Sequence, residues 1–520
     1  LREESSSSAL DHLAIREAKI IMRQQQVGIS GLSLYVPPYR VSLEDWCDWT
    51  EANWGKIQAV VGTSFRMRGP EHNAYTMAAT AVLRLIDAYD VDPHRVRYLA
   101  LGTESSTDNS AGAVIVRGMI DDALRSRGGE PLARGCEVPE FKHACLGGVY
   151  ALKSAVRYVM ADGQGSQAIV VCSDIAEYAR GSSGEPTQGA GAVAMLVEED
   201  PKLMEVHLEG SGSSSDYRGP DFRKPLSRFV GQKPRPMGQL QDLPVFNGKY
   251  STTCYSEATL RSLEDMFTRR EIHAPQYYRD LAAVFLHRPY RRMPESGWAM
   301  GYLFSLAHDD ERERQELKRY CDLAEVDIDE TIAEMDSVPV VRDLVYRDAL
   351  GEEIYPNCVQ LLKTFRKTEE YPDLVLAKMR LGADLMMNVG NIYTGALFAW
   401  LAAGIEEALG EESQLAGEEI LLVGYGSGDA SEAIPVKLVE GWQEAAAKIG
   451  FAKALSYYVD LSEEQYQQLH DDGHSPGLTY DHREEFLVES IGEREEKEFI
   501  DFGIEYYRYR GEPGPPPVAR

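Results

Sequence analysis

Apolar residues along the chain fall into two kinds of segment, which predict an alternation of strands and helices. Uninterrupted apolar runs predict buried strands, at 27–36, 96–101, 167–176, 189–199 and 203–212, the last two as a strand pair. Apolar residues at helical spacing predict helices between them, over 74–89, 113–127 and 146–160. Helices that alternate with buried strands are typical of a layered α/β domain.

The second half of the chain repeats this pattern loosely. Its predicted elements are a helix over 256–270, a strand over 281–290, a helix after Tyr393, and strands over 418–428 and 433–441. This weak duplication predicts two similar α/β halves packed together, 25–212 and 213–505.

The remaining segments differ from this core in composition. Residues 210–248 are rich in Gly, Ser, Pro and basic residues, which predicts a long functional loop between the halves. Residues from about 300 to 380 are acidic and helical, and they are interpreted as an insertion in the second half. The two ends, 1–24 and 506–520, are predicted to be disordered tails.

Charge and composition narrow the possible partners. The formal net charge is −29, so most of the surface should repel nucleic acid and anionic membranes. An anionic ligand would therefore need a local basic pocket. No run of about 18 apolar residues exists, so no transmembrane helix is expected.

The cysteines point to a reducing environment. Seven are scattered along the chain without a C-x-x-C pair. An odd, dispersed set argues against a disulfide framework or a zinc site and favours the cytoplasm. We expect no bound metal.

One cysteine has an unusual setting. Cys145 lies in the segment EFKHACLGGVY (140–150), between an apparent loop and a helix that begins with Gly147 and Gly148. Packing is the ordinary role of a free cysteine. A helix N-terminus, however, is expected to lower the pKa of a thiol, which favours a nucleophile at this position.

Two further residues stand at the ends of predicted strands. Glu104 follows the strand at 96–101. His287 lies at the end of the apolar run within the strand at 281–290. Each has a structural alternative, a cap for Glu104 and a hydrogen-bonded core group for His287. Open α/β sheets also place catalytic groups at such strand ends, so general acid/base chemistry stays open for both.

A basic cluster follows His287 in this acidic chain. Arg288, Arg291 and Arg292 are candidates to receive phosphates, which arginine binds in a bidentate manner. The alternative is a solvated loop that forms weak surface ion pairs. Asn391 and Ser427 lie in small-residue turns, and taken singly each is interpreted as a turn signal.

Taken together and in order, these segments resemble the 3-hydroxy-3-methylglutaryl-CoA synthase family of the thiolase-fold superfamily. The resemblance runs from about residue 95 to 435. It rests on eight segments, GTES, ACLGG, SDIAEYARGSSGEPTQGAGAVAML, DFRKP, GKYSTTCYSEA, LHRPYRRM, GNIYTGAL and GYGSG. It implies an α/β, thiolase-like, duplicated and layered α-β-α-β-α core with the acidic helical insertion in the second half.

The resemblance also implies a chemistry. Cys145 would accept an acetyl group from acetyl-CoA, Glu104 would act as general base and acid, and His287 would polarise the ketone of acetoacetyl-CoA. Water would then release HMG-CoA in a Claisen-type condensation with no cofactor. The residues that would line or support the acyl pocket are Tyr178, Thr187, Asp221, Asn391, Tyr393 and Ser427. The pathway implied is mevalonate formation in isoprenoid biosynthesis, and the implied assembly is a homodimer.

The same comparison suggests where the charge of CoA is bound. Arg223, Lys224, Arg291 and Arg292 are the candidates for its phosphates. The chain departs from the family pattern at Leu146, where an aromatic residue is usual, at Arg292 (usually lysine) and at Gln188 (usually glycine). Lys142 and His143 replace small polar residues. These departures lie beside the thioester and the pantetheine path, so they bear on which acyl substrate is accepted.

Two other functions remain as alternatives. A β-branching synthase of polyketide pathways would use the same three residues on a β-ketoacyl group held by an acyl carrier protein. Such an enzyme should show a basic docking patch, against which the acidic composition argues. A non-catalytic scaffold subunit would have lost the thiol, the carboxylate or the histidine, and this chain keeps all three.

Overall fold

Two groups of strands with the same topology form the centre of the protein. The structure is a computed structural model that describes residues 26–106, 111–221, 223, 243–245, 247–308 and 310–511. In the first half the strand order is β1-β7-β6-β4-β5. These strands are β1 (Val27–Tyr35), β4 (Val96–Gly102), β5 (Glu140–Phe141), β6 (Gln167–Ala176) and β7 (Gly189–Glu199). β4 and β6 are parallel, whereas β7 is antiparallel to β6 and to β1.

The second half repeats these orientations. Its strands are β8 (Met204–Val206), β9 (Gly212–Ser215), β10 (Ala283–Leu286), β11 (Glu419–Gly426) and β12 (Ala430–Leu438). β10 and β11 are parallel, and β12 is antiparallel to β11, to β8 and to β9. The duplicated topology is as predicted for the fold class, but β8 pairs within the second group, whereas the predicted boundary between the halves lies after residue 212.

One predicted strand pairing is wrong. The segment 203–212 was expected to pair with 189–199, but only Met204–Val206 forms a strand, and it pairs with β1 and β12. β8 thereby connects the two groups into one ten-stranded sheet. β7 cannot pair with β8, because both of its edges are already occupied by β1 and β6.

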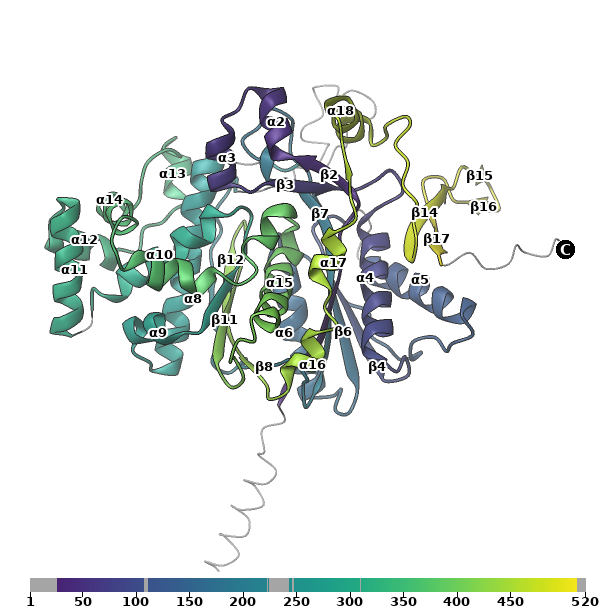
Figure 1. Cartoon of the computed structure of the whole chain (residues 1–520), viewed down its shortest axis with the longest axis horizontal. Helices are drawn as coiled ribbons and strands as arrows, with labels where there is room; N and C mark the ends of the chain where they lie inside the picture. Colours follow the sequence, from purple (N-terminus) through teal and green to yellow (C-terminus); the bar gives the residue numbers. More distant parts are fainter. Residues whose placement is uncertain are drawn as a thin grey trace, which may run out of the picture.

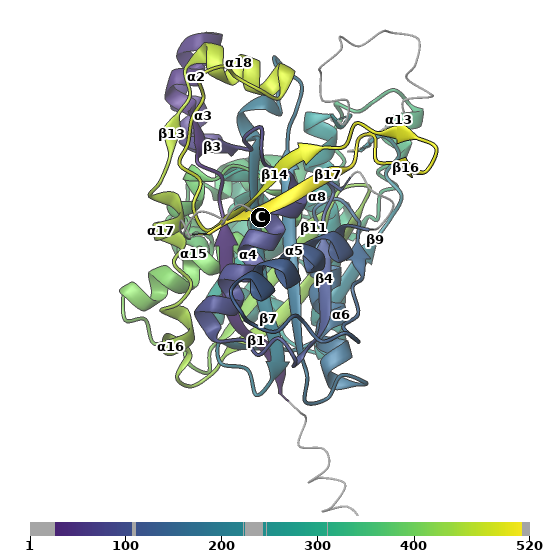
Figure 2. The same cartoon turned by 90° about the vertical axis from the view of Figure 1, so that its right-hand side faces the viewer.

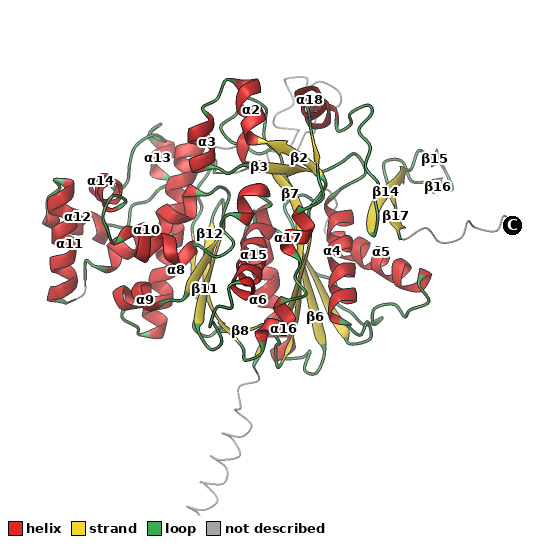
Figure 3. Cartoon of the chain, viewed as in Figure 1, coloured by secondary structure: helices red, strands yellow, loops and turns green. Residues whose placement is uncertain are grey.

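Helices form three layers around the strands (Figures 1 and 3). The central layer contains α6 (Gly147–Met160) and α15 (Ala396–Gly410), and α4 (Ala74–Tyr89) with α5 (Gly112–Ser126) covers one outer face. α8 (Gly248–Arg270), α9 (Ala274–Asp280) and α10 (Arg292–Ser305) lie on the other side. The layered arrangement is as predicted.

Glycines allow α6 to lie close to strands on both sides. A Cβ on Gly148 would come within 2.4 Å of the Cys172 sulfur in β6. A Cβ on Gly424 of β11 would come within 2.7 Å of the side chains of Leu146 and Val149. These close approaches fix the N-terminal end of α6, and hence the neighbouring Cys145, between the two halves.

The acidic segment after α10 is helical, as expected. It forms α11 (Glu311–Ala324), α12 (Ile328–Asp336), α13 (Asp343–Tyr346) and α14 (Pro356–Phe365), at the left of Figure 1. Short turns η2 (Pro372–Leu376), η3 (Ala377–Met379), η4 (Leu385–Asn388) and η5 (Tyr393–Gly395) lead to α15. Within the described ranges, no helix combines the length and apolar composition that crossing a bilayer requires.

After β12 the chain returns to the first half. It forms α16 (Trp442–Ala446), α17 (Phe451–Leu455), β13 (Val459–Asp460) and α18 (Glu463–Asp472). β13 pairs with β2 (Tyr39–Ser42), which also pairs with β3 (Ser64–Met67). The two short helices α2 (Leu43–Thr50) and α3 (Trp54–Val60) lie between β2 and β3 in the sequence.

The C-terminal region also differs from the prediction. Residues 506–520 were expected to be a disordered tail, but Glu505–Arg510 forms β17, which pairs with β14 (Glu485–Ile491). The alternation in EYYRYR turns Tyr507 and Tyr509 toward the α4–α5 core, where Phe486 is buried. Figure 2 shows this hairpin lying over α4 and α5. Two short strands, β15 (Glu495–Glu496) and β16 (Phe499–Ile500), form its tip.

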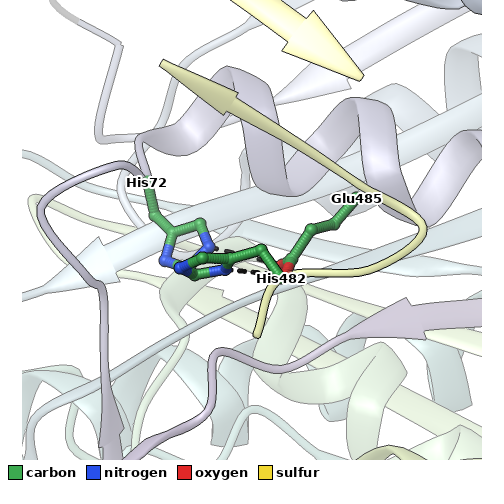
Figure 4. Close-up of side chains that lie close together, drawn as sticks. All are labelled: His72, His482 and Glu485. Carbon is green, nitrogen blue, oxygen red and sulfur yellow. Dashed lines mark hydrogen bonds and ion pairs between the residues drawn. The ribbon is translucent and has the colours of Figure 1, made fainter. Parts of the chain in front are cut away.

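A polar cluster, which we call the clasp, holds this hairpin to the first half. It consists of Tyr35, His72, His482 and Glu485, and Figure 4 shows the last three. Glu485 accepts a hydrogen bond from the Tyr35 hydroxyl and lies 2.8 Å from Nδ1 of His482. The Gly69 N–H donates to Nδ1 of His72, which leaves the ring proton on Nε2, facing Tyr35 and Glu485. With its proton on Nε2, the His72 ring can donate a hydrogen bond to the clasp but cannot bind a metal ion through that nitrogen.

Candidate active site

Cys145 is buried just before α6. It is 8% exposed and packs with Tyr178, Tyr393 and two alanines. The thiol does not have the low pKa that the sequence predicted. Burial, together with the carboxylates of Asp174, Glu104 and Asp221, raises its pKa well above the usual value. The free protein therefore holds a neutral thiol, which needs a proton acceptor before it can attack.

Glu104 is positioned by a buried carboxylate that sequence reasoning missed. Asp174, in β6, accepts the Glu104 N–H at 2.7 Å and the hydroxyls of Thr103 (3.1 Å) and Ser105 (2.9 Å) on one oxygen. The chain after β4 is thereby fixed where it leaves the sheet. The sequence did contain a signal for Asp174, because this carboxylate lies near the end of the apolar run 167–176, as Glu104 lies after the run at 96–101.

The second oxygen of Asp174 reaches the other half of the molecule. It accepts the backbone N–H of Thr394 at 3.0 Å and also the Thr394 hydroxyl. Burial raises the pKa of Asp174, and the hydrogen bonds from Thr394, Glu104 and Ser105 oppose that rise. One buried carboxylate thus connects the strand end that bears Glu104 to the turn that bears Tyr393.

His287 lies at the matching strand end of the second half, directly after β10. Its N–H donates to the Val423 carbonyl (2.7 Å), and its carbonyl accepts from the Tyr255 hydroxyl (2.9 Å). The ring stacks on Tyr425 with 6.3 Å between centroids. Among the described residues, Nδ1 has no hydrogen-bond partner. Burial lowers the His287 pKa to about 3, so the imidazole is neutral at physiological pH.

Asp221 and Ser427 meet on the other side of Tyr425. Asp221 is fully buried and accepts from the hydroxyls of Ser251 and Tyr425, the latter at 3.1 Å. Burial raises the pKa of Asp221, while hydrogen bonds from Ser251, Tyr425 and Ser427 oppose the rise. Tyr425 therefore contacts both Asp221 and His287, a role that the sequence did not suggest.

The remaining predicted pocket residues divide into two places. Tyr178, Asn391 and Tyr393 are hydrogen-bonded to one another beside Cys145, and the Asn391 side chain accepts the Tyr393 N–H at 2.9 Å. Thr187 instead donates its hydroxyl to Gly184 and lines a separate narrow pocket with Arg288.

Two departures from the family pattern make defined contacts. The Gln188 side chain accepts the Tyr178 N–H (3.0 Å) and donates to the Tyr466 hydroxyl (3.2 Å). His470 of α18 lies 2.8 Å from the Tyr178 carbonyl oxygen. Lys142 donates to the Ser106 carbonyl at 3.1 Å. Helix α18 thus supports the segment that carries Tyr178, which the sequence did not indicate.

The structure describes three of the four predicted phosphate-binding residues. Arg291 and Arg292 are about 40% exposed at the start of α10, and both lie within 4 Å of Glu295. Arg223 is exposed and forms an isolated bridge with Val245. Lys224 lies outside the described residues.

Comparison with known proteins gives a consistent result. Residues 23–202 match the model for the N-terminal part of hydroxymethylglutaryl-coenzyme A synthase, and residues 363–472 match that for its C-terminal part. Together the two matches span more than half of the chain. The Haloferax volcanii hydroxymethylglutaryl-CoA synthase is 28% identical over 431 residues, which cover 82% of this chain and 85% of that protein.

Solved structures agree with these matches. MvaS in complex with 3-hydroxy-3-methylglutaryl coenzyme A aligns with a TM-score of 0.71 at 26% identity, over 94% of this chain and 100% of that chain. The HMG synthase of the curacin biosynthetic pathway, in complex with a holo donor-ACP, aligns with a TM-score of 0.65 at 19% identity. That match covers 93% of this chain and 100% of the other, and it shows a shared fold.

Proposed function

This chain belongs to the hydroxymethylglutaryl-CoA synthase family of C–C bond-forming acyltransferases, and from that premise we propose its specific reaction. It joins an acetyl group, held as a thioester on Cys145, to acetoacetyl-CoA or a related 3-ketoacyl-CoA. Hydrolysis then releases HMG-CoA. The fold is thiolase-like.

The observation that carries this proposal is the set of carboxylates acting on the buried thiol. Because Cys145 is neutral in the free protein, its proton must pass to a base as the sulfur attacks acetyl-CoA and the CoA thiol leaves. Asp174, Glu104 and Asp221 are the carboxylates that act on the thiol. Asp174 and Asp221 each accept hydrogen bonds on both oxygens, so we assign Glu104 as the proton acceptor.

The proposed condensation uses the same residues. Glu104 removes a proton from the acetyl methyl, and the resulting carbon attacks the ketone of the acceptor, forming the new C–C bond. The alkoxide takes a proton back from Glu104. His287, neutral at this pH, polarises the ketone as a hydrogen-bond donor. Water then cleaves the thioester, yielding the free carboxylate of HMG-CoA and the Cys145 thiol.

Intact mass spectrometry tests the nucleophile. Incubation with acetyl-CoA should add one acetyl group to the wild type and to Cys47→Ala, which removes a buried thiol remote from the site, but not to Cys145→Ala. Glu104→Gln should be acetylated more slowly than the wild type, because Glu104 accepts the thiol proton. It should form no HMG-CoA when acetoacetyl-CoA is also present, because Glu104 also removes the proton from the acetyl methyl. An unmodified wild type would refute the enzyme proposal.

A second candidate reaction uses the same residues on an acyl carrier protein. It is supported by the shared fold with the curacin HMG synthase and by the exposed Arg291 and Arg292. Comparing turnover of acetoacetyl-CoA with acetoacetyl-carrier protein separates the two reactions. We further propose a homodimer, a role in the mevalonate pathway and a cytoplasmic location. The seven free cysteines support the location.

A further inference from the structure

Arg288, the residue after His287, is buried without an anionic partner. It is 4% exposed. No hydrogen bond or ion pair joins its guanidinium to any residue in the described part of the chain, and its Nη2 is fully shielded from solvent. The guanidinium carbon lies 5.0 Å from the centre of the Trp400 ring. Buried arginines are normally paired, because an uncompensated charge in the interior is strongly destabilising.

The surrounding charges do not neutralise Arg288. Arg291, Glu295 and Asp384 are the charged groups that act on it, and neither carboxylate lies within ion-pair distance. Glu295 instead lies within 4 Å of Arg291 and Arg292. Burial and the neighbouring Arg291 lower the Arg288 pKa to about 10, so the side chain stays protonated at neutral pH.

Arg288 lines a narrow pocket between the two halves. Thr187 and Pro186 form one side, and Val61 with Met387 forms another. Most of the residues that line the pocket are apolar, and the Arg288 guanidinium is the only cationic group among them. The Asn391 N–H donates to the Thr187 carbonyl at 3.1 Å, which places this pocket next to the proposed acyl site.

We propose that Arg288 binds an anionic group of the acceptor thioester, a carboxylate or a phosphate, in this pocket. The proposal rests on the proposed function, because the acceptor is the substrate that His287 would polarise. Arg288 directly follows His287 in the chain, so we assign the anion to the acceptor side. A carboxylate would belong to a dicarboxylic 3-ketoacyl chain, and a phosphate to CoA or to phosphopantetheine.

Thermal unfolding separates ligand binding from a structural role. Arg288→Met and Arg288→Gln should raise the Tm of the free protein, since each removes an unpaired buried charge. Arg380→Met, which breaks an exposed pair with Glu411, is the matched control and should change Tm little. A fall in Tm in both Arg288 variants, with KM unchanged, would show that the residue only packs on Trp400 and would overturn the proposal.

Steady-state kinetics with three acceptors identify the anion. The acceptors are acetoacetyl-CoA, acetoacetyl-N-acetylcysteamine, which has no phosphate, and the N-acetylcysteamine monothioester of 3-oxoglutarate, which adds a carboxylate. Loss of one charge-assisted contact should raise KM about tenfold or more, and Arg288→Lys should restore part of it. A rise only with the CoA thioester assigns a phosphate, and a rise only with 3-oxoglutaryl assigns a carboxylate.

Equal KM values for wild type and Arg288→Met with all three acceptors would overturn the inference. Acetylation of Cys145 by acetyl-CoA, followed by intact mass in the same variants, keeps this failure distinct. If the wild type is acetylated and turns over but Arg288→Met is unaffected, only the inference about Arg288 fails. If the wild type is not acetylated, the proposed function fails.

Discussion

Replacing Asp174 by Asn tests whether one carboxylate holds the two halves of the site in register. The two oxygens of Asp174 accept five hydrogen bonds, three on one side and two from Thr394 on the other. Asn keeps one oxygen and puts an NH₂ group against donors in either orientation. In the better orientation the NH₂ group of Asn faces Thr394. The Thr394 hydroxyl can then rotate and accept from it, but the Thr394 backbone N–H loses its acceptor.

The size of the effect follows from these contacts. A lost hydrogen bond to a charged group contributes about 1.5–3 kcal/mol, and a buried unsatisfied donor costs about 1–3 kcal/mol. We therefore expect Asp174→Asn to lower the free energy of unfolding by about 3–5 kcal/mol. That is a large part of the roughly 5–15 kcal/mol typical of a folded protein.

Urea unfolding at pH 7 measures this loss as a shift in midpoint at constant m-value. Acetylation of Cys145 in the folded variant should also slow, because the chain that carries Glu104 is no longer fixed. Asp122→Asn is the control, since Asp122 is exposed and forms only a surface pair with Arg125. Loss of less than about 1 kcal/mol, well below the hydrogen-bond range above, with normal acetylation would refute the reasoning.

Three further predictions concern charge and the C-terminal hairpin. The His287 pKa of about 3 lies below the unfolded value of about 6.5, so unfolding takes up a proton between these values. Stability should fall as pH drops from 6.5, by up to about 1.4 kcal/mol per pH unit, and His287→Gln should flatten this slope in urea unfolding at pH 7, 6 and 5. Arg291→Ala and Arg292→Ala should raise KM for acetoacetyl-CoA and weaken its salt dependence, because each removes a cation at the expected phosphate site. Glu485→Gln should speed limited proteolysis after residue 473, since the clasp loses its shared carboxylate.

Each of these has a contradicting result. Parallel pH slopes in wild type and His287→Gln would show that His287 is not the titrating group. An unchanged KM at low salt would exclude Arg291 and Arg292 from phosphate binding. An unaltered cleavage rate in Glu485→Gln would mean that apolar packing of Phe486 alone holds the hairpin.

Local patterns were enough to predict most of the core. The helix at 74–89 and the strands at 167–176 and 189–199 have the predicted bounds. Each of these elements buries its own apolar residues, so the spacing of those residues within the element is enough to identify it. The strand ends that carry Glu104 and His287 follow from the same patterns. The pairing of β8 was not predictable in this way, since it depends on which sheet edges other strands have already occupied.

The chemistry of the site depended on contacts between distant segments. A helix N-terminus predicts a low thiol pKa for Cys145, but burial and three carboxylates from separate elements outweigh it. Asp174 and Thr394 are 220 residues apart in sequence, and no local pattern shows that they meet. The C-terminal strand β17 was missed because the adjacent Pro- and Gly-rich end dominated the composition, although EYYRYR alternates as a strand does.

The clasp places a constraint on how the chain is made. Tyr35 and His72 leave the ribosome 450 and 413 residues before Glu485, their common partner. At about 5–20 residues per second, these two residues wait roughly 20–90 s for that partner. During this interval the apolar surface of α4 and α5 that Phe486 covers stays exposed, until the hairpin at 485–510 has been made. Folding during synthesis therefore depends on this hairpin, and a ribosome that stalls before residue 485 would leave that apolar surface exposed to chaperones.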